Sequence, residues 1–385
     1  MAALGLLAVS APLAATFVPS TALIDKDRCA EYDTSVTPPT CVRRVNEPVQ
    51  FALVPADAQP VAPRLTIHGA STYPTSDQVY FVTITQPEIS ILDWWIIRDS
   101  DATRFMSYRD KYGDQTPQQV VQSGQRQMRS AKDNAMYVAF KAAGLDVELQ
   151  PGEVIIDFLL CLEANEAGTE CTKFSPADDV LDPGDVITKV DGQAVETIED
   201  LGPILKNIEP GGTVEVEFTR KGEPMTGQIT TILAPGEDPP RTIIGFRPID
   251  TTTVKLPEGI DVNIDTDQIG GPSAGLAFTL TLIDQLTKGN LLGGQKVAVT
   301  GTIELDGQVG AIGGLAAKAA AVAQVGVKYF LVPTSQGMDG PDGILQARKA
   351  VGDDVEIIPV ATLDEALAAL QRLGGDPLQP ANLRN

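Results

Sequence analysis

The last third of the chain has the composition pattern that most restricts the fold. Between Ile243 and Leu373, short apolar runs alternate with alanine-rich stretches of helical character. Such an alternation of strands and helices is typical of an α/β domain. The six residues 235–240, rich in proline, have the composition of a linker just before it. The sequence therefore predicts a C-terminal α/β domain over residues 241–373, followed by a short tail, 374–385.

The middle of the chain, residues 146–235, predicts a small domain that is rich in strands. Pro183-Gly184 opens a short apolar strand, and Asp191-Gly192 turns that strand back as a tight hairpin. A helix and two further strands are expected to complete the unit, over residues 197–206, 213–219 and 227–233.

This middle unit resembles a PDZ domain of the circularly permuted type found in bacterial envelope proteases. The resemblance implies that the unit binds an extended peptide, often a C-terminal tail, by adding it as a strand to the edge of a sheet. It places the peptide-gripping loop near Leu149–Val154. A small all-β packing module without a ligand is the alternative interpretation.

The first residues indicate a membrane or export segment. Residues 1–24 contain no charged side chain, and the first charged residue is Asp25. About 20 apolar residues cross a bilayer as a helix, so this stretch predicts a transmembrane anchor or a signal segment. A buried core helix is the alternative, which Pro12 disfavours because it interrupts the stretch.

The region that follows, residues 25–145, is expected to be an N-terminal α/β region that begins with a proline-rich linker. Apolar runs at residues 79–84 and 89–92 predict strands. Apolar residues at three- and four-residue spacing predict a helix over residues 117–144. No catalytic pattern is recognisable here, so this region is expected to be structural. The predicted fold class is thus multi-domain α+β, with an N-terminal α/β region, a β-rich PDZ domain and a C-terminal α/β domain.

The four cysteines form two local pairs, Cys29 with Cys41 and Cys161 with Cys171. Each pair brackets a short polar loop, which predicts two disulfides in an oxidising compartment. A zinc site built from all four is the alternative, but their spacings differ from the Cys-x-x-Cys pairs of such sites. Together with residues 1–24, the cysteines predict a single-pass protein of the cell membrane with its bulk outside the cytoplasm.

Two features of the composition exclude whole classes of function. The chain has 29 Lys and Arg against 51 Asp and Glu, a formal net charge of −22, which argues against nucleic acid as a partner. Its only histidine is His68. A metal site with several histidines is therefore impossible, and a Ser-His or Cys-His catalytic pair would have to use this one residue.

A candidate nucleophile lies in the C-terminal domain. Ser273 follows Gly270-Gly271-Pro272 and precedes an apolar stretch that begins after Ala274. Small neighbours leave the serine accessible, and backbone N–H groups at a helix start can stabilise an oxyanion. The alternative is an ordinary helix N-cap, a position that favours serine for its hydrogen bonding alone.

A candidate base lies further along the chain. Lys318 belongs to a helix that is otherwise built from small and apolar residues, between Leu315 and Val325. It is either a surface charge or a buried amine. Burial lowers the pKa of a lysine from about 10.4, and a neutral lysine can take the proton from a serine hydroxyl without any histidine.

Taken together, Pro272-Ser273-Ala274-Gly275, the Thr300-Gly301 turn and the helix start that contains Lys318 resemble the proteolytic domain of Lon proteases. With the PDZ-like unit and the N-terminal segment, the chain is similar to the PDZ-containing, Lon-like proteases of bacterial envelopes. The resemblance implies that Ser273 is the nucleophile, that Lys318 is the general base and that Thr300 positions the lysine. Gly271 and Ala274 are expected to support the site.

The sequence departs from ATP-dependent Lon enzymes in three ways. Gly270 stands where those enzymes usually carry an aspartate, and Thr302 replaces the glutamate of their Thr-Gly-Glu turn. The phosphate-binding motif Gly-x-x-x-x-Gly-Lys-Ser/Thr is absent from the sequence. We therefore expect ATP-independent hydrolysis of peptide bonds in unfolded or flexible segments, with no cofactor and no metal.

Three further expectations concern partners. The strand before the serine is expected to pair with the substrate backbone through Val262, Ile264 and Thr266. Protein or peptide substrates are the expected partners, together with the membrane, a PDZ ligand and other copies of the chain. A non-catalytic, membrane-anchored PDZ scaffold with a Lon-like assembly domain is the alternative function, and a superfamily relative among kinases and translation factors is a more remote one.

Overall fold

The computed structural model describes residues 16–33, 40–73, 78–113, 115–164, 171–234, 242–335, 339–340 and 342–379. The chain forms two compact units. The first comprises residues 1–113, 121–146 and 257–385, and the second comprises residues 114–120 and 147–256. The long stretch of the second unit is therefore an insertion in the chain of the first.

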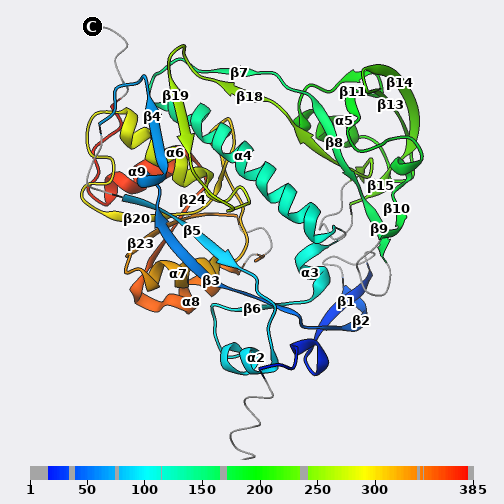
Figure 1. Ribbon diagram of the computed structural model, residues 1–385, viewed down its shortest axis with the longest axis horizontal. Helices are drawn as coiled ribbons and strands as arrows, with labels where there is room; N and C mark the ends of the chain where they lie inside the picture. The colour runs from blue at the N-terminus through cyan, green and yellow to red at the C-terminus, as the bar shows by residue number, and fades with distance from the viewer. Residues whose placement is uncertain are drawn as a thin grey trace, which may run out of the picture. The chain divides into compact units, whose positions relative to one another are not determined.

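The first unit is built on a six-stranded mixed sheet with the order β24-β23-β20-β5-β3-β6. The first four strands of this order run parallel, whereas β3 is antiparallel to both β5 and β6. Blue, cyan and orange strands lie in one sheet, so strands from both sides of the insertion pair with one another (Figure 1). The bounds are β24 (Glu356–Val360), β23 (Tyr329–Pro333), β20 (Lys296–Val299), β5 (Gln78–Thr85), β3 (Phe51–Pro60) and β6 (Arg104–Met106).

Residues 25–145, which the sequence analysis distinguished as an N-terminal α/β region, therefore share a sheet with the C-terminal domain. The proline-rich start of this region is not simply a linker, because Phe51–Pro60 forms β3 of that sheet. Its strand β5 is parallel to β20 on one side and antiparallel to β3 on the other. Strands with buried neighbours on both sides cannot leave the sheet without exposing apolar area. The predicted strand at 89–92 is wrong, because Ser90 caps the helix α2 (Ile91–Ile97) with a capping box.

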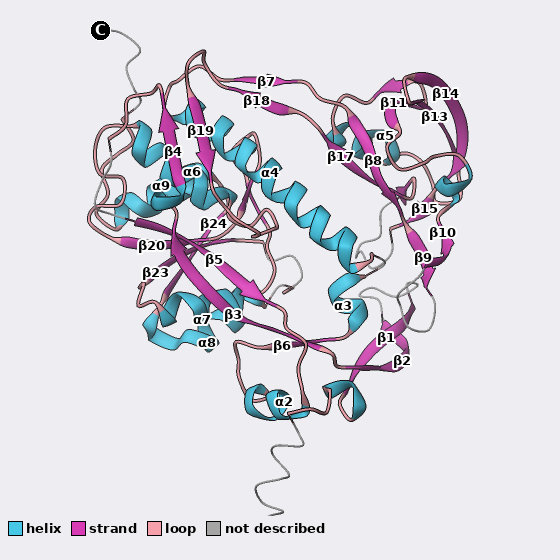
Figure 2. Ribbon diagram, viewed as in Figure 1, coloured by secondary structure: helices cyan, strands magenta, loops and turns pink. Residues whose placement is uncertain are grey.

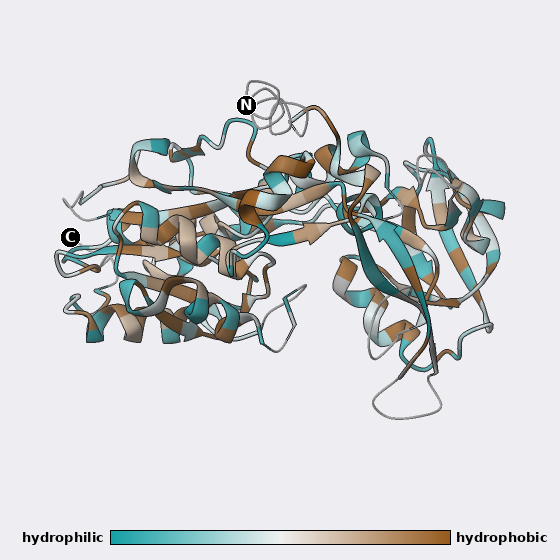
Figure 3. Ribbon diagram, turned by 90° about the horizontal axis from the view of Figure 1, so that it is seen from below, coloured by the Kyte–Doolittle hydropathy of each residue, from teal (hydrophilic) through white to brown (hydrophobic). Residues whose placement is uncertain are grey.

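Helices cover both faces of this sheet (Figure 2). On one face, Val82 of β5 belongs to a buried cluster with Leu315 and Ala319 of α7 (Leu315–Gln324), and α8 (Gly343–Val351) packs on α7. On the other, the ring of Phe81 lies 6.1 Å from that of Phe278 in α6 (Gly275–Leu286). Consecutive residues of a strand point to opposite faces, so β5 supports both layers. Teal and brown accordingly alternate along many ribbons (Figure 3).

The predicted helix over 117–144 is confirmed as α4 (Pro117–Ala142). Its buried residues recur at three- and four-residue spacing and form one face. They include Met128, Ala131, Ala135, Val138 and Ala139.

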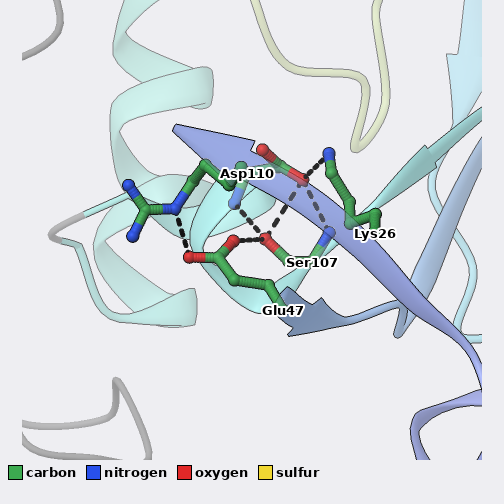
Figure 4. A network of polar contacts seen from close by, with 5 residues as sticks. Lys26, Glu47, Ser107 and Asp110 are labelled. Atoms are coloured by element: carbon green, nitrogen blue, oxygen red, sulfur yellow. Dashed lines mark hydrogen bonds and ion pairs between the residues drawn. The ribbon is translucent and has the colours of Figure 1, made fainter. Parts of the chain in front are cut away.

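A hairpin of β1 (Asp25–Asp33) and β2 (Thr40–Pro48) is joined to the short helix α3 (Tyr108–Tyr112) by polar side chains (Figure 4). Ser107 caps α3 and also donates to Glu47 over 2.8 Å. Lys26 pairs with Asp110 at 2.6 Å. Since Ser107 is 3% exposed, this network is partly shielded from solvent.

Smaller elements complete the first unit. They are β4 (Leu65–His68) paired with β19 (Asp261–Ile264), β21 (Thr302–Ile303) paired with β22 (Val309–Gly310), α9 (Leu363–Arg372), and three 3-10 helices, η1 (Ser20–Ala22), η2 (Ala62–Arg64) and η5 (Gly352–Asp354).

The second unit contains a sheet with the order β14-β13-β11-β8-β17, and β12 pairs with β11. The predicted hairpin is confirmed, because Asp191 and Gly192 both have positive φ, 48° and 72°, between β11 and β12. The strands of this sheet are β14 (Glu223–Thr230), β13 (Thr213–Arg220), β11 (Val186–Val190), β8 (Val154–Leu159), β17 (Phe246–Asp250) and β12 (Gln193–Ala194). The other elements are β7 (Glu148–Gln150), β9 (Cys161–Ala164), β10 (Cys171–Phe174), η3 (Pro176–Asp179), η4 (Ile198–Asp200), α5 (Leu201–Leu205), β15 (Ile232–Leu233), β16 (Thr242–Ile243) and β18 (Thr253–Lys255).

The disulfide between Cys161 and Cys171 is confirmed and joins β9 to β10. Cys41 is also disulfide-bonded, and the side chain of Cys29, its expected partner, lies outside the described residues. Most of the predicted membrane segment, residues 1–15, lies outside them as well. Over the ranges that the structure describes, we find no helix both long and apolar enough to span a bilayer.

Candidate active site

Three residues from separate elements of the first unit meet at one point. The Nζ atom of Lys318 lies 2.7 Å from Oγ of Ser273 and 2.9 Å from Oγ1 of Thr300. Ser273 lies two residues before the start of α6, Thr300 follows β20, and Lys318 lies on α7. The structure thus brings together the three side chains that the sequence singled out.

The backbone fixes the loop of Ser273 against the turn of Thr300. The carbonyl of Ser273 accepts hydrogen bonds from N–H of Gly301 at 2.9 Å and from Oγ1 of Thr300 at 3.1 Å. In return, N–H of Leu276 donates to the carbonyl of Gly301 at 3.1 Å. These bonds hold the backbone of Ser273 in place against the turn that carries Thr300.

Lys318 is a buried amine and not a surface charge. Its exposed fraction is 2%, and that of Thr300 is 0%. Burial penalises the ammonium form and lowers the pKa of Lys318 from 10.5 to about 7, against a smaller opposite effect from Asp339. A large fraction of the lysine is therefore neutral near pH 7 and can accept a proton.

Asp339 is a residue of the site that the sequence interpretation missed. Its Oδ2 atom accepts a hydrogen bond of 2.7 Å from N–H of Leu315, in the first turn of the helix that carries Lys318. Its Oδ1 atom lies 3.8 Å from Arg104 on β6. Nothing near residue 339 in the sequence marks it, because its role depends on a contact with a distant helix start.

A cavity of about 710 Å³ opens beside the serine. Its walls come from β5, from α4 and from the loops before and after the three central residues. The lining residues are Gln59, Phe81, Val82, Thr83, Ile84, Met128, Gln268, Ile269, Gly270, Pro272, Ser273, Ala274, Thr302, Ala311, Ile312, Gly313 and Lys318. The mixture of apolar side chains and backbone suits a peptide segment.

The supporting residues Gly271 and Ala274 take up different positions. Ala274 lines the cavity and is 5% exposed. Gly271 has φ of +90° and donates its N–H to the carbonyl of Gly124 in α4 at 2.8 Å. The positive φ explains a glycine at this position.

The residues expected to bind substrate along β19 do not line the described cavity. Val262 and Ile264 pair with Ile67 and Leu65 of β4, so one edge of β19 is already covered. Ile264 and Thr266 are 3% and 5% exposed. The sequence pattern could identify the strand but not the partner that covers its edge, which is distant in sequence.

His68 belongs to β4 and is not among the residues that line the described cavity. No cluster of three or more His, Cys, Asp or Glu suited to a metal ion occurs in the part of the chain that the structure describes.

Comparisons with known proteins identify both domains. Residues 251–372 match the family model of the Lon protease (S16) C-terminal proteolytic domain, and residues 161–231 match that of the PDZ domain. A Lon protease of Xanthomonas oryzae pv. oryzae is 40% identical over 111 residues, which cover 29% of this chain and 12% of that protein. A Lon protease of Chloroflexus aggregans is 34% identical over 133 residues, 34% of this chain and 14% of that protein.

Among solved structures, the PDZ domain of an SdrC-like protein of Listeria monocytogenes is similar, with 19% identity and a TM-score of 0.21. The match covers 26% of this chain and 93% of that domain. The chain thus spans only a small part of the length of the Lon proteases that it matches. It combines a Lon-type proteolytic domain with a PDZ domain, which is the composition of a PDZ-containing, Lon-like protease.

Proposed function

We propose that the chain is an ATP-independent serine endopeptidase that uses Ser273 and Lys318 as a catalytic dyad. The observation that carries this proposal is the 2.7 Å contact between the serine hydroxyl and a lysine that is 2% exposed. A nucleophile within hydrogen-bond reach of a base, which a third residue orients, is the arrangement that nucleophilic catalysis requires. Thr300 is that third residue, at 2.9 Å from the lysine.

The reaction is an acyl transfer. Neutral Lys318 takes the proton of the Ser273 hydroxyl, and the oxygen of the serine attacks the carbonyl carbon of the scissile peptide bond. The ammonium of Lys318 then gives this proton to the leaving amine. Water hydrolyses the ester on Ser273 in a second step, with Lys318 again as base.

The negative oxygen of the tetrahedral intermediate needs donors close to Ser273. The helix α6 begins two residues later and has no side-chain N-cap. The first N–H groups of a helix lack intrahelical acceptors, and the helix dipole favours negative charge at this end. We assign the oxyanion to the backbone N–H groups around Ser273 and Ala274.

The substrate class follows from the cavity and from the sequence. The cavity takes up a peptide segment, and the sequence contains no phosphate-binding loop that would couple ATP hydrolysis to unfolding. Unfolded proteins and flexible tails are therefore the proposed substrates, and the PDZ domain recruits them or regulates the site.

The proposed location is the cell membrane, with the bulk of the chain outside the cytoplasm and with residues 1–24 as anchor or signal segment. Support comes from the uncharged composition of these residues and from the disulfide between Cys161 and Cys171, since disulfides persist in oxidising compartments. Association of several copies, as in ring-forming proteases, belongs to the same proposal. Protease accessibility in intact cells and sedimentation of the purified chain test the two points separately.

The decisive experiment incubates the purified chain with β-casein, an unfolded protein, without ATP. We compare it with the variants Ser273→Ala and Lys318→Ala, and with the matched controls Ser130→Ala and Lys296→Ala, whose side chains are exposed. The expected result is cleavage by the wild type and both controls and none by the two dyad variants. Equal activity in all five proteins would rule out the dyad, and inactivity of all five would favour the scaffold function.

A further inference from the structure

In the second unit, the strand that follows the expected peptide-gripping loop has no open edge. This strand, β8, pairs with β11 on one side and with β17 on the other. The strands β8 and β17 lie side by side (Figure 2). Their ladder is antiparallel and runs from Phe246 opposite Leu159 to Asp250 opposite Val154. A PDZ domain binds its peptide by adding a strand to such an edge, so β17 stands where a ligand strand would add.

The expected peptide-gripping loop is occupied as well. The N–H of Gly152 donates to Oγ1 of Thr252 at 3.1 Å, and the N–H of Glu153 donates to Oγ1 of Thr251 at 2.7 Å. The carbonyl of Glu153 accepts from the N–H of Thr251 at 3.1 Å. Consecutive backbone N–H groups in a loop can also hold the carboxylate of a peptide C-terminus. The two threonine hydroxyls therefore take the acceptor positions that a terminal carboxylate would fill.

The fit at Gly152 is close. A Cβ atom at this position would lie 2.1 Å from the carbonyl carbon of Thr251 and 2.1 Å from the nitrogen of Thr252. Only glycine allows the backbone of these threonines to approach the loop so nearly. The loop and the segment after β17 are therefore closely complementary in shape at Gly152.

A helical segment lies on the other side of β17. The strand contacts both β8 and η4. Phe246 of β17 and Ile198 of η4 pack against the same buried cluster, which includes Ile156 of β8. An extended segment that lies between a strand edge and a helical turn, with an apolar side chain directed into the core, is placed as a bound peptide would be.

We propose that residues 246–252 are a built-in ligand of the PDZ domain, so that an extended peptide with a free C-terminal carboxylate binds only by displacing them. The ladder has a weak point suited to displacement. Its register shifts between Arg247 and Pro248, and proline donates no hydrogen bond to a ladder. This inference does not depend on the peptidase activity.

The experiment measures binding of a fluorescein-labelled peptide with the sequence of residues 244–252, Ile-Gly-Phe-Arg-Pro-Ile-Asp-Thr-Thr, and a free carboxylate. The protein is the full chain with Ser273→Ala, which prevents cleavage. The test variant adds Thr251→Val and Thr252→Val, which keep the side-chain shape but remove both acceptors. The matched control adds Thr226→Val and Thr230→Val on β14, where both side chains are exposed.

We expect the test variant to bind the peptide about tenfold or more tightly than the parent and the control, because each lost hydrogen bond weakens the internal competitor. An amidated peptide should bind the variant about tenfold more weakly than the free acid. Equal affinity of parent and variant, or no binding by either up to about 1 mM, which is a weak limit for peptide recognition, would overturn the proposal.

Hydrogen exchange gives a second readout, which needs no added peptide. The proposal predicts that amides in residues 154–159 and 246–250 are protected from exchange in the parent chain. In the variant with Thr251→Val and Thr252→Val this protection should be lost, whereas that of β13 should not change. Exchange of residues 246–250 in the parent as fast as in an unpaired chain would contradict it.

Discussion

The backbone N–H of Gly271 donates to the carbonyl of Gly124 over 2.8 Å and thereby ties α4 to the loop that carries Ser273. The backbones of Gly270 and Gly124 lie so close that a side chain would be crowded at Gly270 but not at Gly124. A Cβ atom on Gly270 would lie 3.1 Å from the carbonyl carbon of Gly124, whereas one on Gly124 would lie 3.6 Å from Cα of Gly270, an ordinary contact. The position of the nucleophile therefore depends on a glycine at residue 270.

This asymmetry predicts different effects for two alanine substitutions. Gly270→Ala should push the loop away from α4 and lower kcat/KM about tenfold, since a small misplacement of a nucleophile is costly. Gly124→Ala should leave kcat/KM within about twofold and raise the free energy of unfolding by about 0.5–1 kcal/mol, the gain of alanine over glycine inside a helix. Steady-state kinetics and urea unfolding of both variants check this; equal loss of activity in the two would contradict it.

Thr300 is a positioning residue for Lys318, to which it is hydrogen-bonded at 2.9 Å. Thr300→Val keeps the shape but removes the hydroxyl, which leaves the buried amine with one fewer partner. We expect kcat to fall about tenfold to a hundredfold, as for a lost buried hydrogen bond of about 1–3 kcal/mol. Thr300→Ser should restore most of the activity with KM unchanged. A valine variant with full kcat would show that the hydroxyl is dispensable.

Asp339 raises the pKa of Lys318, in opposition to the larger effect of burial. Asp339→Asn removes this charge and can still accept the hydrogen bond from Leu315. The rising limb of kcat/KM against pH should therefore move to lower pH than in the wild type. Asp364→Asn, at an exposed position in the first turn of α9, is the control and should not move it. A limb that moves to higher pH would contradict the assignment.

Burial of Lys318 should also destabilise the fold, in a way that pH reveals. A pKa lowered from 10.5 to about 7 corresponds to a penalty on the order of 5 kcal/mol at neutral pH, partly offset by two hydrogen bonds of about 1 kcal/mol each. Lys318→Met should therefore raise the free energy of unfolding by about 2–3 kcal/mol at pH 7.

The direction in which the free energy of unfolding changes with pH follows from proton binding to Lys318. Between pH 7 and 10.5 the unfolded wild type holds the proton of Lys318 and the folded state does not, so wild-type stability rises with pH over this range. The advantage of Lys318→Met should therefore shrink by about 1.4 kcal/mol per pH unit, vanish near pH 9 and reverse above it. Urea unfolding of both proteins at pH 7, 8.5 and 10 checks this, and an advantage independent of pH would refute it.

The central residues could be predicted from the sequence because each belongs to a short local pattern. Ser273 follows small residues at a helix start, and Lys318 lies in a helix that is otherwise small and apolar. The turn at Asp191-Gly192 and the disulfide between Cys161 and Cys171 are likewise local.

The features of the fold and of the site that were not predicted depend on contacts between parts of the chain that are distant in sequence. The parallel pairing of β5 with β20 joins strands that the PDZ domain separates in sequence, so β5 was assigned to another region and its cavity-lining residues were missed. Asp339 and the cover of β4 on β19 were missed for the same reason. No local periodicity reports such pairings.

The central claim is that a neutral Lys318 activates Ser273. Its most direct test is the pH dependence of acylation, measured as the burst of p-nitrophenol from a peptide p-nitrophenyl ester. The account predicts a burst rate that rises about tenfold per pH unit below pH 7 and levels off above it, in line with the lowered pKa of Lys318, and no burst with Ser273→Ala or Lys318→Ala. A rate that is flat with pH, or a burst that survives Lys318→Ala, would contradict it.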